Sequence, residues 1–149
     1  MAKVQTGSIF ELVGIHRLGI VANHSQIDGI KFIVVYPLSH AVYMASDADF
    51  IILEEKCFDN KPMMAESWNT VAIPATSLGK YHGRLSGKYK DYFSSFVYFK
   101  HQSSKNQGIK LLTGPPLTAN NDVRRLFRAQ ELEELYPLRE LLITTPVEH

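Results

Sequence analysis

The chain has 149 residues, of which 45% are hydrophobic, 21% are charged and 11% are aromatic. This composition is typical of a globular protein and excludes a disordered chain, which has few hydrophobic residues and a high net charge. One compact domain is expected at this length, large enough to fold without a disulfide or a metal. The net charge of +1 gives no indication of a nucleic-acid partner.

Cysteine and histidine usage restricts the chemistry further. Cys57 is the only cysteine, which excludes an intramolecular disulfide and a multi-cysteine zinc site. The six histidines lack metal-binding spacing, and nucleotide-binding, zincin and hydrolase motifs are absent, so we expect no metal and no organic cofactor. The opening MAKVQTGS lacks the pattern of a secretory signal, and the apolar runs are far shorter than the roughly 20 residues that span a bilayer. We expect a soluble, cytoplasmic protein with no membrane partner.

Short runs of β-branched and aromatic residues predict β-structure in the first half of the chain. Strands are expected at Ser8–Val13, Leu18–Ala22, Ile30–Tyr36, Phe50–Glu55 and Thr70–Ile73. The polar segment between the second and third strands ends in Asp28-Gly29, which favours a tight reversal and a hairpin. Pro37 is expected to end the third strand. Short antiparallel strands at this spacing indicate a small barrel or a strongly curved sheet.

The segment after these strands is predicted to be helical and is strongly basic. From Lys80 to Lys110 there are seven basic residues, one acidic residue and seven aromatic residues. Base stacking on such aromatics would suit single-stranded nucleic acid. However, Tyr89, Phe93 and Phe96 have the spacing of the buried face of an amphipathic helix, and we prefer this core interpretation.

The C-terminal part is predicted to form an edge strand, Gly108–Leu112, and a further helix capped by Asn120 or Asn121. Pro137 is expected to kink or restart this helix. Its predicted apolar face consists of Val123, Leu126, Phe127, Gln130, Leu135, Leu138, Leu141 and Leu142. The acidic cluster Glu131, Glu133 and Glu134 is expected on the solvated face. Residues 1–101 would form a barrel with the following helix, and residues 102–149 a linker and a helical extension packed on the same domain.

Candidate catalytic residues come from two short segments. His16-Arg17 precedes the second strand, and Ser39-His40 follows the third. If these strands form a hairpin, the start of one lies beside the end of the other, which would bring Arg17, Ser39 and His40 to one rim. An arginine forks onto phosphate oxygens, and serine or histidine can hydrogen-bond or transfer a proton. The trio would suit phosphoryl transfer, and the alternative is that these are ordinary loop residues.

Four short motifs occur in the same order as in a known family, and the likeness extends from Gly7 to about Val97, roughly two thirds of the chain. They are Gly7–Leu12, Arg17–Val21, Val34–Ser39 and Gly83–Ser86. They resemble, in turn, the opening Gly-Asp-Ile strand, the Arg-Pro-x-x-Val strand, the strand ending in Pro-[Ile/Leu]-[Thr/Ser] and the Gly-x-Leu-Ser junction of the PemK/MazF-like toxins. This resemblance implies a mainly β fold with appended helices, in which a small SH3-like antiparallel barrel is followed by C-terminal helices.

The resemblance also implies a function, which is metal-independent cleavage of single-stranded RNA by a toxin-antitoxin endoribonuclease. Arg17 would be the catalytic arginine and Ser39 the active-site hydroxyl, to which we add His40 for proton transfer. Arg84, Lys88 and Lys90 would hold the RNA backbone. An antitoxin protein and a second copy of the chain would be partners.

Two other functions remain open. The chain is alternatively a non-catalytic barrel module that binds protein or nucleic acid, because a fold does not determine a function. It is otherwise a small assembly protein that associates through Trp68 and the Met63-Met64 pair. An open basic groove where Arg17 meets Ser39 would favour the enzyme, whereas an acidic or occluded rim would favour the module.

Overall fold

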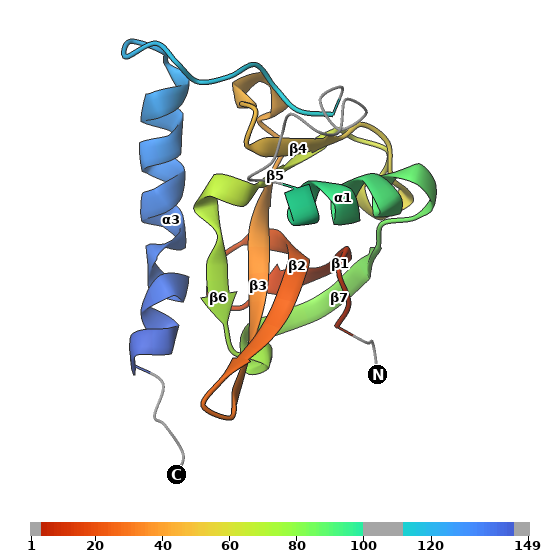
Figure 1. Ribbon diagram of the computed structural model, residues 1–149, viewed down its shortest axis with the longest axis vertical. Coiled ribbons are helices and arrows are strands. Elements are labelled where there is room, and N and C mark those ends of the chain that lie inside the picture. The colour runs from red at the N-terminus through yellow and green to blue at the C-terminus, as the bar shows by residue number, and fades with distance from the viewer. Residues whose placement is uncertain (1–3, 100–111, 145–149) are drawn as a thin grey trace.

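The computed structural model describes residues 4–99 and 112–144. These residues form a mainly β fold with two appended helices, which confirms the predicted fold class (Figure 1). The strands are β1 (Ser8–Leu12), β2 (Arg17–Ile27), β3 (Ile30–Ser39), β4 (Asp49–Ile52), β5 (Met63–Glu66), β6 (Val71–Ile73) and β7 (Leu78–Arg84). The helices are α1 (Gly87–Phe99) and α3 (Arg124–Thr144), with short 3-10 helices η1 (Val42–Met44), η2 (Lys56–Phe58), η3 (Ser67–Asn69) and η4 (Ala75–Ser77).

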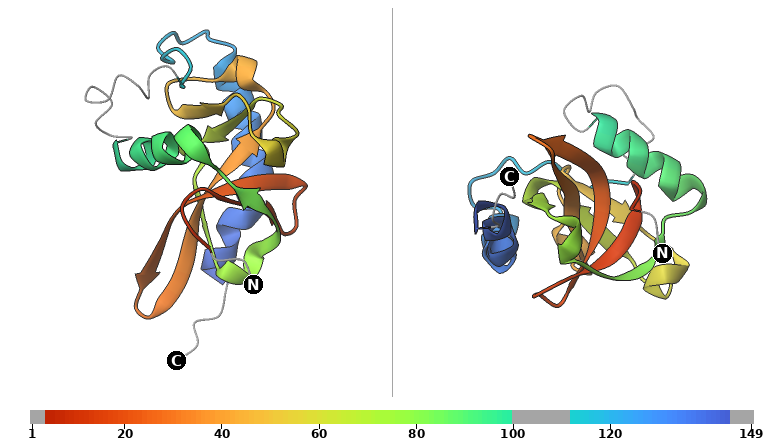
Figure 2. Two further views of the ribbon diagram at one scale, coloured as in Figure 1. Left: turned by 90° about the vertical axis from the view of Figure 1, so that its right-hand side faces the viewer. Right: turned by 90° about the horizontal axis from the view of Figure 1, so that it is seen from below.

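The strands pair antiparallel in the order β4-β5-β3-β2-β1-β7, and β6 pairs with β3. Strand β3 is central because its two halves have different neighbours on the side away from β2. Ile33–Val35 pairs with β6, whereas Leu38 and Ser39 pair with β5. The sheet is strongly curved, as the view from below in Figure 2 shows. Within the described residues the terminal strands β4 and β7 do not pair with each other, so the sheet does not close.

Strands β2 and β3 form the predicted hairpin, but both are longer than expected. Ile27 pairs with Ile30 across a two-residue turn, in which Asp28 and Gly29 have φ values of 51° and 81°. Two positive φ angles are the signature of the turns that match strand twist. Pro37 does not end β3, because the strand continues to Ser39. Pro37 lies between the part of β3 that pairs with β6 and the part that pairs with β5. On this edge of β3 the missing N–H of the proline therefore costs no hydrogen bond between strands.

The sheet buries apolar side chains on both faces, because successive strand residues point in opposite directions. One cluster contains Ile20 and Tyr36 and is covered by α1, whereas the other contains Val21 and Val35 and is covered by α3. The two helices accordingly lie on opposite sides of the sheet in Figure 2.

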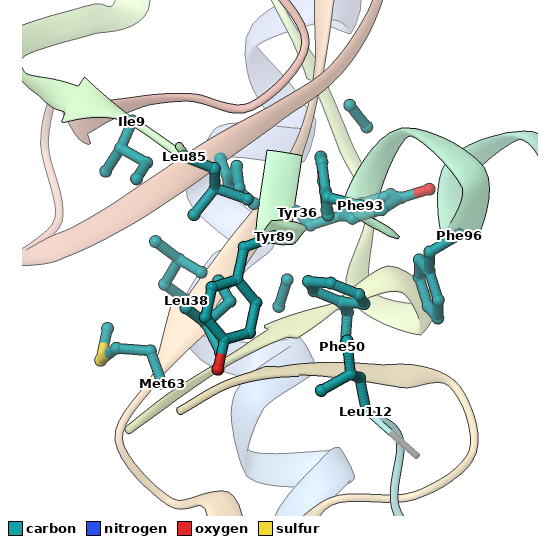
Figure 3. Packing of buried hydrophobic residues seen from close by; sticks show 14 of the residues in the cluster. Ile9, Tyr36, Leu38, Phe50, Met63, Leu85, Tyr89, Phe93, Phe96 and Leu112 are labelled. Atoms are coloured by element: carbon teal, nitrogen blue, oxygen red, sulfur yellow. The ribbon is translucent and has the colours of Figure 1, made fainter. Parts of the chain in front are cut away.

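Aromatic side chains fill the cluster under α1 (Figure 3). Phe93 is fully buried, with its ring centroid 5.9 Å from that of Tyr36 and 5.4 Å from that of Phe50. These rings meet edge to face, the geometry that their quadrupoles favour. The predicted core role of the α1 aromatic stripe is therefore confirmed. Met63 and Met64 are also buried, so this pair is not available for assembly.

Helix α3 packs on β6 with a face that differs from the predicted one. Leu135 and Leu138 are buried, but Val123 and Leu126 are 59% and 69% exposed. The helix continues through Pro137, so the expected restart does not occur there. Of the predicted edge strand, only Leu112 lies within the described residues, and its carbonyl accepts a hydrogen bond from the Ile51 N–H at 2.6 Å. Neither described helix is long and apolar enough to cross a bilayer.

Phe93→Ala should lower the free energy of unfolding by about 3 to 5 kcal/mol, because it opens a cavity between two rings that cannot collapse freely. Urea denaturation followed by circular dichroism measures this loss. Ser94→Ala, an exposed neighbour on the same helix, is the matched control and should change stability little. Equal stability of the two variants would contradict the packing described for α1.

Candidate functional site

The hairpin brings Arg17, the first residue of β2, to the end of β3. The Arg17 Nε donates a hydrogen bond to the Leu38 carbonyl at 3.0 Å. The guanidinium group is thereby held beside the backbone that leads into Ser39. We call this place, formed by Arg17 and the Leu38–Ser39 end of β3, the Arg17 rim.

The other two predicted catalytic residues lie at this rim without touching the arginine. Ser39 is partly buried, and its Oγ accepts a hydrogen bond from the Ala41 N–H at 3.0 Å. His40 is exposed directly after β3, and its carbonyl accepts a hydrogen bond from the Val42 N–H. In the described part of the chain, the polar partners of the Arg17 side chain are the Leu38 carbonyl, Glu66, Glu131 and Glu134, not Ser39 or His40. In this conformation both residues accept hydrogen bonds from the backbone that follows β3.

Three carboxyl groups surround the Arg17 guanidinium. Nη1 lies 2.9 Å from Glu131 Oε2 and 3.3 Å from Glu134 Oε2, both on α3. Nη2 lies 3.5 Å from Glu66 Oε1 at the end of β5. The side chains of Arg17, Glu66 and Glu131 are 11%, 0% and 9% exposed. The rim is therefore acidic, and α3 covers it.

The prediction that Glu131 lies on a solvated helix face is wrong. The residue points inward because Arg17 is largely buried and a buried charge needs a partner. Glu134 is half exposed and reaches the arginine from the edge of the helix, whereas Glu133 faces solvent. The charged face of a helix can thus be the face that packs on the sheet, when a buried residue of opposite charge lies at the contact.

Beneath α3 the pKa values of Glu66 and Glu131 are shifted in opposite directions. Burial raises the pKa of Glu66 to about 9, and the hydrogen bond and negative charge of Glu131 add to this effect. Burial opposes the charge on Glu131, but the hydrogen bond with Glu66 and the charge of Arg17 outweigh it and lower its pKa. Burial likewise opposes the charge of Arg17, yet the surrounding carboxylates raise its pKa. At neutral pH Glu66 is protonated, and Glu131 forms the ion pair with Arg17.

Asn69 links this group to the rest of α3. Its Nδ2 donates to Glu66 Oε1 at 3.1 Å and to the Glu131 carbonyl at 3.2 Å. Its Oδ1 accepts a hydrogen bond from Arg139, one turn further along α3 than Leu135. The sequence analysis missed Glu66, Asn69 and Arg139. The one available signal was a lone carboxylate directly after the apolar run Met63–Ala65.

The predicted backbone-binding residues lie elsewhere. Arg84, at the end of β7, pairs with Ser8, and its Nε donates to the Thr6 carbonyl at 3.2 Å. Lys88 and Lys90 are exposed on α1, on the opposite side of the sheet from α3 (Figure 2). The structure therefore does not bring these three residues to the Arg17 rim.

An open hollow adjoins the rim at the turn between β1 and β2. Its lining includes His16 and Arg17 together with Glu11 and Gly79. Across the described residues no three His, Cys, Asp or Glu side chains come together as a metal site would require.

Comparison with known proteins gives no relative: neither a scan of family models nor a search of the curated proteins found a match. The functional argument therefore depends on the fold and on the geometry of the rim.

Glu66→Gln should remove part of the pH dependence of stability. The folded-state pKa of Glu66 is raised from 4.5 to about 9, so its stabilising effect is complete below about pH 4.5 and is lost as the pH rises towards 9. Between pH 5 and 9 the wild type should lose up to about 1.4 kcal/mol per pH unit from this group. Glutamine stays neutral, so its urea-unfolding profile should be flatter. The exposed Glu54→Gln variant is the control, and a profile for Glu66→Gln that equals it would contradict a protonated Glu66.

Proposed function

We propose that the chain is a metal-independent endoribonuclease of the PemK/MazF-like kind, which cleaves single-stranded RNA at the Arg17 rim. One observation supports this proposal above the others. Arg17 is held by the Leu38 carbonyl beside Ser39, and its outer nitrogens gather carboxylate oxygens. Because the guanidinium fork suits carboxylate and phosphate oxygens alike, this position is suited to a phosphodiester.

The proposed reaction is an internal transfer within the RNA. The 2′-oxygen attacks the adjacent phosphorus as its proton leaves, and the bond from phosphorus to the 5′-oxygen breaks. The products are a 2′,3′-cyclic phosphate and a 5′-hydroxyl group, which takes up a proton. Arg17 would neutralise the charge that develops on the non-bridging oxygens, Ser39 would position the phosphate, and the exposed His40 would transfer a proton.

Other parts of the molecule, away from the Arg17 rim, would bind the RNA and give it access to the rim. Arg84, Lys88 and Lys90 would hold nucleotides on the side of the sheet covered by α1. The hollow beside the β1–β2 turn would give RNA access to Arg17. An enzyme of this kind would act in the cytoplasm, with an antitoxin and a second copy of the chain as partners.

A non-catalytic module is the second candidate, and the closed rim favours it. Arg17 is covered by α3 and is paired with carboxylates, which is the acidic and occluded arrangement expected of a binding module. In this conformation a phosphate cannot replace the carboxylates without moving the helix. The module would use its rim to hold a carboxylate-bearing helix, here its own α3.

Cleavage of a mixed single-stranded RNA in EDTA separates the two candidates. The wild type should give fragments with 2′,3′-cyclic phosphate ends, and Arg17→Ala should lower the rate by roughly 10² to 10³-fold, because it removes an oxyanion-stabilising group. The variant Glu131→Gln/Glu134→Gln is included because its side chains compete less for Arg17. If no Arg17-dependent cleavage is seen from either folded protein that retains Arg17, the module is the better conclusion.

Lys88→Ala/Lys90→Ala should weaken binding of single-stranded RNA and reduce its salt dependence. The slope of log affinity against log salt should decrease by roughly 1.4, about 0.7 for each lost phosphate contact. Fluorescence anisotropy at several salt concentrations measures this slope. Lys31→Ala/Lys61→Ala removes two exposed lysines elsewhere and should leave the slope unchanged. Equal slopes for the two double variants would remove α1 from the proposed RNA-binding surface.

A further inference from the structure

We propose that α3 is a removable cover of the Arg17 rim, in which Glu131 and Glu134 occupy the place of a nucleic-acid phosphate. The closed conformation would then be an inhibited state, and movement of α3 would open an oxyanion site. The identity of the ligand rests on the proposed function, whereas the competition for Arg17 does not.

The face of α3 that meets the sheet is mainly charged. Arg124 Nη1 donates to the Ala45 carbonyl at 2.8 Å, Arg128 lies over the Trp68 ring, and Arg139 donates to Asn69. Among the described side chains, Leu135 and Leu138 are the buried apolar contribution of this helix. Interfaces of this polar kind resemble transient protein contacts more than permanent cores. The contacts therefore suit a helix that docks and leaves.

The carboxylates of α3 satisfy Arg17 only in part. Glu131 and Glu134 both face Nη1, whereas Nη2 is buried and lacks a hydrogen-bond partner among the described residues. Its nearest carboxyl oxygen is that of Glu66 at 3.5 Å, and Glu66 is protonated at neutral pH. A buried donor without a partner costs free energy. A phosphate has enough acceptor oxygens to engage both terminal nitrogens, so it can compete with the helix.

The position of α3 can be followed by fluorescence. Trp68 is the only tryptophan in the chain. Its Nε1 donates to Asp49 Oδ1 at 2.8 Å, and the Arg128 guanidinium carbon lies 4.8 Å from the ring centroid. When α3 leaves, the indole loses this cation and gains solvent. Trp68 emission therefore reports docking of the helix independently of any activity.

Two kinds of variant should open the rim. Arg124→Ala removes an anchor at the start of α3 and leaves both the rim and the Arg128 contact with Trp68 intact, whereas Glu131→Gln/Glu134→Gln weakens the competing groups in place. The probe is a fluorescein-labelled single-stranded 2′-O-methyl RNA, which cannot be cleaved because it lacks a 2′-hydroxyl. Both variants should bind it roughly tenfold more tightly than the wild type. Arg124→Ala loses one positive charge, which alone would weaken binding, so a gain reports uncovering.

Matched controls complete the experiment. Arg125→Ala removes an exposed arginine of the same helix, which contacts the carbonyls of Thr118 and Ala119, and should change neither affinity nor Trp68 emission. Adding Arg17→Ala to each opened variant should abolish its gain in affinity. Circular dichroism verifies that the sheet of every variant is retained.

The outcomes distinguish this inference from the proposed function. An Arg17-dependent gain in binding without RNA cleavage would support the cover and count against the enzyme. Cleavage by the wild type at the rate of the opened variants would support the enzyme and overturn the cover. The cover is also overturned if Trp68 emission shows that α3 has left in Arg124→Ala but affinity does not rise, or if α3 stays docked and affinity is unchanged in both variants.

Discussion

The charge of Arg17 is the constraint on which the rest of this structure depends. A largely buried guanidinium group loses most of its hydration, and the loss is tolerable only with counter-charges and hydrogen-bond acceptors close by. The sheet supplies the Leu38 carbonyl and the neutral carboxyl of Glu66, and α3 supplies the negative charge of Glu131. The position of α3, the acidity of the rim and its closure all follow from this single need.

Under the proposed function, RNA cleavage and closure by α3 would both depend on Arg17. The features that fit Arg17 to a phosphate also fit it to a carboxylate, so any helix that carries carboxylates at the correct spacing becomes a competitor. The enzyme and the module share the same architecture. The two proposals would differ in the free energy that separates a docked α3 from an open one, to which the polar contacts of α3 far from the rim would contribute as well as the rim itself.

Local patterns predicted what is locally determined. Asp28-Gly29 gave the hairpin, and with it the meeting of Arg17 with the end of β3, while the spacing of the aromatic residues gave the buried face of α1. Strand β5 was missed because three apolar residues followed by a glutamate show no clear alternation, and β7 because its run is interrupted by glycines and charges. Glu131 was placed in solvent because its partner lies 114 residues away in the sequence, where no periodicity reports it.

The divided pairing of β3 has a further consequence for how the rim tolerates change. The ladder that pairs Leu38 with Ala65 and Ser39 with Met64 also fixes where Glu66 emerges from β5. A shift of one residue in this ladder would invert the facing of every β5 side chain, so the carboxyl would leave Arg17 and Ala65 or Ser67 would take its position. A change in the length of the loop that precedes β5 could therefore disturb the charges around Arg17 although it lies far from that residue. Substitutions keep the register, so only a change in loop length would reveal this dependence.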